Sequence, residues 1–218
     1  MGSYIIDKFG LSSISPNYYV YNEKFPNKII NIVPHGEKYE VKEVLDKTID
    51  TKILVYEDRV TGWFLDFAKK LAKKENSEFV VMMICMNYLE GKQQFVDGKK
   101  SNKGESTKVL KKALVSIFPN TDEKDIDFLI YGVRHGLFHD GMTKRGILLR
   151  YKLSIPFFSF ISDEERWLEI DPLLFLEKIG ADFKEYITKL KDKNNALLRD
   201  NFEKHYNESY EKSPEFNS

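Results

Sequence analysis

The densest group of residues that could do chemistry lies at positions 131–142, with the sequence YGVRHGLFHDGM. It contains Arg134 and two of the four histidines of the chain, His135 and His139. An arginine near a histidine is what RNA cleavage without a metal requires. The guanidinium holds the phosphate and neutralises charge that develops in the transition state, while an imidazole moves a proton near pH 7. The attacking group would be the RNA's own 2′-hydroxyl.

The spacing of these residues limits how they can meet. Arg134 and His139 are five residues apart, so a regular α-helix separates them by roughly 140°. Convergence then requires the reach of the arginine side chain, a helix that ends near Gly141, or a second copy of the segment from a partner subunit.

The run Arg134 to His139, RHGLFH, resembles the R-x(4–6)-H motif of the HEPN superfamily. In that family a polar residue usually follows the arginine, and the motif lies near the end of a helix late in a small bundle. The resemblance extends loosely over residues 57–207. It implies a mainly α-helical, HEPN-like bundle and a metal-independent endoribonuclease of bacterial or archaeal defence or toxin–antitoxin systems. It further implies RNA as substrate, no cofactor, a homodimer whose two motifs share one cleft, and an antitoxin or other regulatory protein as partner.

The resemblance also implies roles for individual residues. Arg134 and His139 would be the catalytic pair, with Arg134 on the scissile phosphate and His139 as general acid or base. His135 would be the supporting polar residue. We expect Glu90, within an apolar run, and Asp140 to lie behind these groups without contacting substrate.

Other interpretations of the same residues stay open. Arg134 could be structural and pair with Asp127, Asp140 or a helix C-terminus, and His139 could cap the helix. His135 and His139 are four residues apart and would suit a metal, but no glutamate follows His135 and no third ligand is evident. Some HEPN-like proteins are non-catalytic modules that bind RNA, a nucleotide or a protein.

A second family offers a more remote alternative. The run 133–136, VRHG, contains the R-H-G of histidine phosphatases, in which the histidine becomes phosphorylated. That motif resembles the end of a β-strand near the start of a larger α/β domain, so this alternative requires residues 128–133 to form a strand.

Basic stretches on both sides of the motif bear on the substrate. Residues 97–112 hold six lysines against two acids, and no acid lies between Gly141 and Lys152. Such patches can track a phosphate backbone. Lys103, Lys144 and Arg145 are therefore predicted to bind RNA.

The elements that must position these residues follow from apolar periodicity. Residues 60–72 and 79–89 predict helices, the second of them buried, and a third spans about 105–118. The motif helix begins at a cap at Asn120 or Thr121. Residues 146–155 and 167–170, separated by a turn at 162–165, predict an antiparallel hairpin. A long helix then runs from Asp171-Pro172 to about His205.

This pattern predicts an irregular or short-stranded arm over residues 1–38, a helical domain over 39–210 and a polar tail over 211–218. The chain has 218 residues, with 34 basic and 34 acidic side chains, which excludes the strong overall positive charge of a generic nucleic-acid binder. The single cysteine, Cys85, excludes an intrachain disulfide and a cysteine-based zinc site. No apolar stretch approaches the roughly 20 residues that span a bilayer, and the N-terminus lacks a signal-peptide pattern, so we expect a cytoplasmic protein without a membrane partner.

Overall fold

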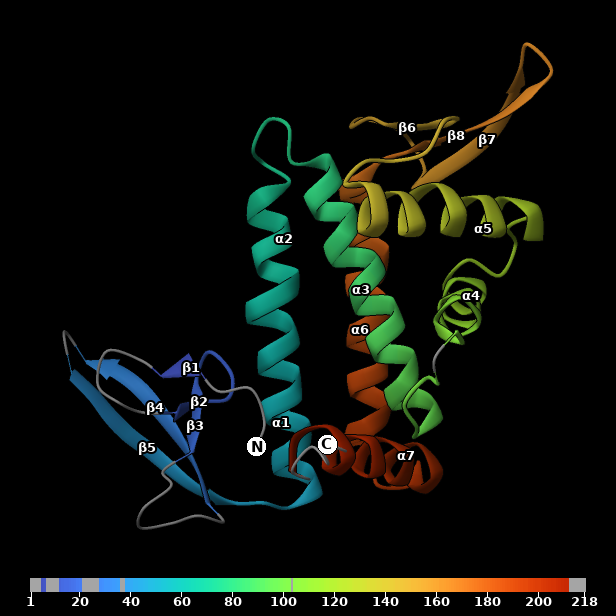
Figure 1. Ribbon diagram of the computed structural model, residues 1–218. Coiled ribbons are helices and arrows are strands. Elements are labelled where there is room, and N and C mark those ends of the chain that lie inside the picture. The colour runs from blue at the N-terminus through green and yellow to red at the C-terminus, as the bar shows by residue number, and fades with distance from the viewer. Residues whose placement is uncertain (1–4, 7–11, 21–27, 36–37, 103, 212–218) are drawn as a thin grey trace, which may run out of the picture. The chain divides into compact units, whose positions relative to one another are not determined.

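The computed structural model describes residues 5–6, 12–20, 28–35, 38–102 and 104–211, and is drawn in Figure 1. The chain is mainly helical and divides into two compact units. One unit comprises residues 1–64 and 187–218, and the other comprises residues 65–186. Among the described residues, no helix combines the length and the apolar character needed to cross a membrane.

The unit made from both chain ends contains an antiparallel sheet. Its strands follow one another in sequence order, and they are β1 (Ile5–Ile6), β2 (Ser12–Ser13), β3 (Tyr18–Val20), β4 (Lys28–His35) and β5 (Lys38–Asp46). β4 and β5 form the longest pairing (Figure 1), and the register of this pairing shifts between Asn31 and Ile32. The short strands expected near the N-terminus are therefore present. The expectation that the helical domain starts at residue 39 is wrong, because residues 38–46 pair with β4.

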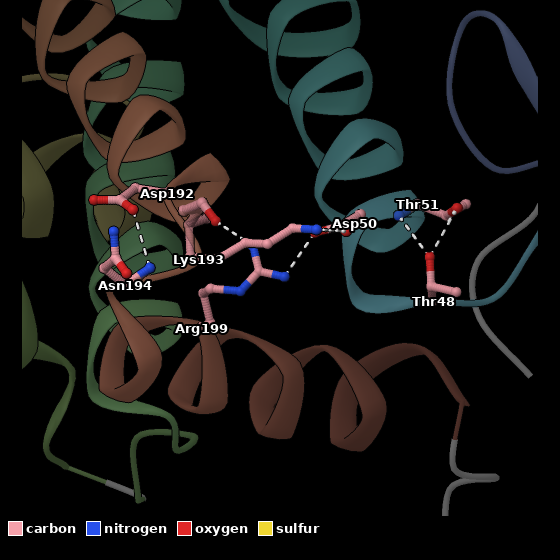
Figure 2. A network of polar contacts seen from close by, with 8 residues as sticks. Thr48, Asp50, Thr51, Asp192, Lys193, Asn194 and Arg199 are labelled. Carbon is pink, nitrogen blue, oxygen red and sulfur yellow. Dashed lines mark hydrogen bonds and ion pairs between the residues drawn. The ribbon is translucent and has the colours of Figure 1, made fainter.

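Helices complete this unit. α1 (Ile49–Arg59) continues into the π-helical segment η1 (Val60–Leu65), and α7 (Ala196–Tyr206) continues into η3 (Asn207–Glu211). Thr48 caps α1, since its side-chain oxygen accepts the N–H of Thr51 at 3.3 Å (Figure 2). Val55 of α1 is buried with Ile14, Val20 and Ile29, which joins α1 to the sheet.

The predicted long closing helix is broken near its end. α6 (Pro172–Lys191) and α7 are separated by a turn in which Asp192 accepts the N–H of Asn194 at 2.9 Å (Figure 2). Arg199 of α7 stabilises the turn, donating to the carbonyl of Leu190 and to the carboxylate of Asp50, each at 2.6 Å. A continuous helix to His205 was therefore the wrong prediction.

The other unit is a helical core with a small sheet. Its helices are α2 (Asp66–Leu71), α3 (Glu78–Asp97), α4 (Ser106–Ile117), α5 (Glu123–Leu129), the π-helical η2 (Ile130–Asp140) and most of α6. The helices predicted at 79–89 and 105–118 correspond to α3 and α4, and the helix predicted at 60–72 corresponds to η1 followed by α2. α3 is the central one and packs on α2, α4 and η2. The cap of α5 is Asp122, which accepts the N–H of Lys124 at 2.8 Å, rather than Asn120 or Thr121.

The predicted hairpin is present with a different first strand. β7 (Phe157–Ser162) pairs antiparallel with β8 (Glu165–Ile170), and β6 (Ile147–Leu149) lies parallel to β8 on its other side. Asp163 and Glu164 form the turn with φ of 50° and 64°, the left-handed values that the two-residue type I′ hairpin loop requires. Residues 146–155 supply only the short parallel strand, because the hairpin partner is β7. The small sheet ends directly before α6, as predicted.

Candidate functional site

The residues of the RHGLFH motif lie on η2, which continues α5 as a single helix (Figure 1). A π-helix bonds each N–H to the carbonyl five residues earlier, so each turn holds more residues than an α-helical turn. Arg134 and His139, five residues apart, are consequently about one turn apart. The separation of roughly 140° expected for an α-helix does not apply. η2 ends at Gly141, whose φ of 74° is left-handed.

The chain folds back closely against η2 after this end. A Cβ atom on Gly136 would lie 2.6 Å from the carbonyl oxygen of Met142 and 2.9 Å from the amide nitrogen of Lys144. The Lys144 N–H donates to the carbonyl of Gly132 at 2.9 Å. Glycine at position 136 therefore permits the contact that brings Lys144 beside the motif.

Arg134 is held by one carboxylate and one aromatic ring. Its Nε and Nη2 atoms lie 3.4 and 3.3 Å from Oε2 of Glu90 on α3. Its Cζ atom lies 4.1 Å from the ring centroid of Phe138, a cation–π contact. The Arg134 and Glu90 side chains are 19% and 17% exposed, so solvent still reaches both. The partner of Arg134 is thus Glu90, and not Asp127 or Asp140.

The two histidines of the motif stack on one another. The ring centroids of His135 and His139 are 5.7 Å apart with an interplanar angle of 20°. Burial lowers the pKa of His135 below its ordinary value, and the positive charges of Arg134, His139 and Lys144 lower it further. His135 is therefore neutral at pH 7 and can accept a proton or a hydrogen bond, while His139 is exposed to solvent.

Carboxylates neutralise the basic residues that follow the motif. Lys144 donates a hydrogen bond to the carboxylate of Asp140, with which it also forms an ion pair. This hydrogen bond raises the pKa of Lys144. Arg145 contacts both carboxylate oxygens of Glu165, at 3.0 and 2.9 Å. The acid-free segment between Gly141 and Lys152 is therefore paired with carboxylates from η2 and β8. Asp140 therefore pairs with Lys144 and not with Arg134. Lys103, the third residue predicted to bind RNA, lies outside the described residues.

The described residues add no third ligand to the metal site that His135 and His139 could form. Within the ranges that the structure describes, no three His, Cys, Asp or Glu side chains gather as they would around a metal ion. Cys85 is buried, and this burial raises the pKa of its thiol. The phosphatase alternative loses the strand on which it depends, because residues 128–133 are helical.

Phe138 belongs to the site but was not predicted from the sequence. Phe138 covers the guanidinium of Arg134, and the available signal was its position four residues after the arginine, a spacing at which helical side chains are neighbours. The contact between Arg134 and Glu90 had no such local signal, since 44 residues separate the two. No protein-family model, curated protein or solved structure matches the chain.

Proposed function

We propose that the protein is a cytoplasmic, metal-independent endoribonuclease of HEPN type. It would cleave RNA by attack of a 2′-hydroxyl on the adjacent phosphate. One observation carries the proposal: a single π-helical segment presents a solvent-accessible arginine together with a stacked pair of histidines. These are the phosphate-binding and proton-transferring groups that the reaction requires.

Arg134 binds the non-bridging oxygens of the scissile phosphate and stabilises the charge that develops on them. His139 is exposed and moves a proton, either from the attacking 2′-hydroxyl or to the departing 5′-oxygen. Neutral His135 is able to accept a proton or a hydrogen bond beside it. The new bond joins the 2′-oxygen to phosphorus and the broken bond joins phosphorus to the 5′-oxygen. The products are a 2′,3′-cyclic phosphate and a 5′-hydroxyl.

A second copy of the chain is the partner proposed for the motif surface. Three large apolar side chains beside the catalytic groups are solvent-exposed, with Tyr131 57%, Phe138 36% and Met142 60% exposed. Burial of such residues favours association. In a twofold dimer through this surface, two motifs would face one RNA, and an antitoxin or other regulatory protein would control access in a defence or toxin–antitoxin setting.

A non-catalytic module that binds RNA, a nucleotide or a protein is the second candidate. The observation that favours it is the contact between Arg134 and Glu90, because an arginine already paired with a carboxylate also fits a structural role. This candidate predicts a salt-dependent RNA interaction that survives Arg134→Ala.

Cleavage of a mixed RNA pool in EDTA tests the proposal. The proteins are wild type, Arg134→Ala, His139→Ala and, as a matched control, His35→Ala, which removes an exposed histidine from β4. We expect wild type and the control to leave 2′,3′-cyclic phosphate and 5′-hydroxyl ends, and both motif variants to lose cleavage.

Two results would count against the nuclease. If Arg134→Ala and His139→Ala both still cleave RNA, then neither Arg134 nor His139 takes part in the mechanism. RNA binding without cleavage by folded wild type, unchanged in Arg134→Ala, favours the binding module.

A further inference from the structure

A small pocket of about 250 Å³ lies where the end of α3 meets the start of α4. Gln94 and Asp97 of α3 line it, as do residues 99–101 and Glu105 of the connection and the first turns of α4. Its charged lining consists of four lysines and two carboxylates, namely Lys99, Lys100, Lys108, Lys112, Asp97 and Glu105.

Both carboxylates of the pocket are occupied by partners. Asp97 forms an ion pair with Lys112 and accepts a hydrogen bond from Gln93 at 3.0 Å. Glu105 accepts the backbone N–H of Asn102 at 3.1 Å. Its pKa is lowered first by hydrogen bonds to Asn102 and then by the charges of Lys99 and Lys108.

Two lysines of the pocket remain available to a ligand. In the described part of the chain, neither Lys99 nor Lys108 forms an ion pair or a side-chain hydrogen bond, and both are exposed. With four lysines against two carboxylates, the lining of the pocket carries a net positive charge. Its volume is below the roughly 300 to 1,000 Å³ of sites for drug-sized ligands, which favours a small anion over a whole nucleotide.

The pocket is connected to the motif through α3. Gln94 lines the pocket, and Glu90, four residues earlier on the same helix, contacts Arg134. Residues four apart share a helix face, and their Cα atoms are displaced by about 6 Å along the axis. The lysine pocket and the arginine that we assign to the scissile phosphate thus lie on one side of α3.

We propose that this pocket binds a second phosphate of the RNA strand whose scissile phosphate is bound by Arg134. This inference rests on the proposed function. Lys99 and Lys108 bind the phosphate oxygens and position the strand, while the chemistry stays at η2.

The test measures binding of 2′-O-methyl oligonucleotides, which lack the attacking hydroxyl, from a dinucleotide upward. The variant is Lys99→Ala/Lys108→Ala. The control is Lys73→Ala/Lys74→Ala, which removes the same charge from exposed positions after α2. We expect the pocket variant to lose the gain in affinity that wild type shows with strand length. Its log–log salt slope should fall in magnitude by about 0.7, as expected for one lost phosphate contact on a single strand. The control should retain both properties.

A second measurement separates failure of this inference from failure of the proposed function. Inorganic phosphate is titrated while the backbone amide signals of Lys99 and Ser101 are followed by NMR. Oligonucleotide binding that the pocket variant leaves unchanged overturns the inference and leaves the nuclease proposal standing. If inorganic phosphate shifts these signals but the protein binds no oligonucleotide, then RNA is not the substrate and no RNA strand connects the pocket to Arg134. The ligand of the pocket is then a free phosphate compound.

Discussion

Two nitrogens of Arg134 share a single oxygen of Glu90, with Nε at 3.4 Å and Nη2 at 3.3 Å from Oε2. Both distances exceed the usual N–H···O range of about 2.7–3.2 Å. The pair is therefore loose, and the guanidinium keeps donors for another anion. Glu90 both orients Arg134 and competes with any phosphate that Arg134 binds.

Replacing Glu90 by Gln should tighten RNA binding. The substitution keeps the shape and an oxygen acceptor but removes the competing negative charge. We expect the Kd for a 2′-O-methyl oligonucleotide to fall several-fold at low salt, with less effect at high salt because salt screens the charge. Fluorescence anisotropy at two salt concentrations measures this. Weaker binding by Glu90→Gln would mean that orientation of Arg134 outweighs competition.

His135 should titrate below the ordinary histidine pKa of 6.5. Its folded-state pKa is lowered, so the unfolded state binds more protons just below pH 6.5. Stability should therefore fall as the pH decreases through that window. Arg134→Gln removes one of the causes and should shift the His135 pKa upward, which NMR titration of the ring protons detects. An unchanged His135 pKa in Arg134→Gln would show that the charge of Arg134 does not reach the ring.

Gly136→Ala should destabilise the fold and Gly91→Ala should not. The new methyl group at position 136 meets backbone atoms of residues 142–144, at distances from 2.6 to 3.1 Å, and backbone cannot move away as a side-chain end can. Overpacking of this kind costs about 1–3 kcal/mol. Gly91 lies within α3 with nothing inside 4 Å of an added Cβ, so alanine there should be neutral or stabilising by up to about 1 kcal/mol.

Urea denaturation of both glycine variants compares them directly. Equal stability of Gly136→Ala and wild type would contradict the close approach of residues 142–144 to η2.

Arg199→Met should weaken the unit that contains both chain ends. It removes the hydrogen bonds to Leu190 and Asp50 and leaves a carbonyl without its donor, at a cost of about 1–3 kcal/mol. The Arg199 hydrogen bond is the main cause that lowers the pKa of Asp50 below its ordinary 3.8. The stabilisation from this pair is thus present above about pH 4 and is lost as the pH falls.

Denaturation at neutral and at acidic pH tests this dependence. The difference between wild type and Arg199→Met should shrink in acid. A difference of the same size at both pH values would assign the loss to packing alone.

Local sequence patterns predicted most of the helices. The apolar stripe of residues 60–72 and the apolar run from 79 to 89 identify them because helical burial repeats every three or four residues. β5 was missed since its run, KYEVKEVLD, gains its structure from pairing with β4, and none of its side chains from Glu40 to Asp46 is buried. The break before α7 was missed because the stabilising contacts of Arg199 come from Leu190 and from Asp50, 149 residues away.

The motif itself was found from residue types, and its geometry was not. Arg134, His135 and His139 stand out by composition alone. The π-helical winding has no local signature, and it changes the angular relationship between Arg134 and His139. The carboxylates opposite Arg145 and Lys144 come from β8 and from the last residue of η2, so the apparent basic patch could be judged only in three dimensions.

β5 also affects how the protein behaves in concentrated solution. It is an edge strand of its sheet, and among the described residues no further strand pairs with its outer side, so its backbone groups there form a template on which another chain could add a strand. Exposed Glu40, Lys42, Glu43 and Asp46 place charges along this edge, which opposes edge-to-edge aggregation. Neutralising these four side chains should therefore lower the concentration at which the protein self-associates, without altering the side-chain contacts of Arg134 and Lys144 on and beside η2.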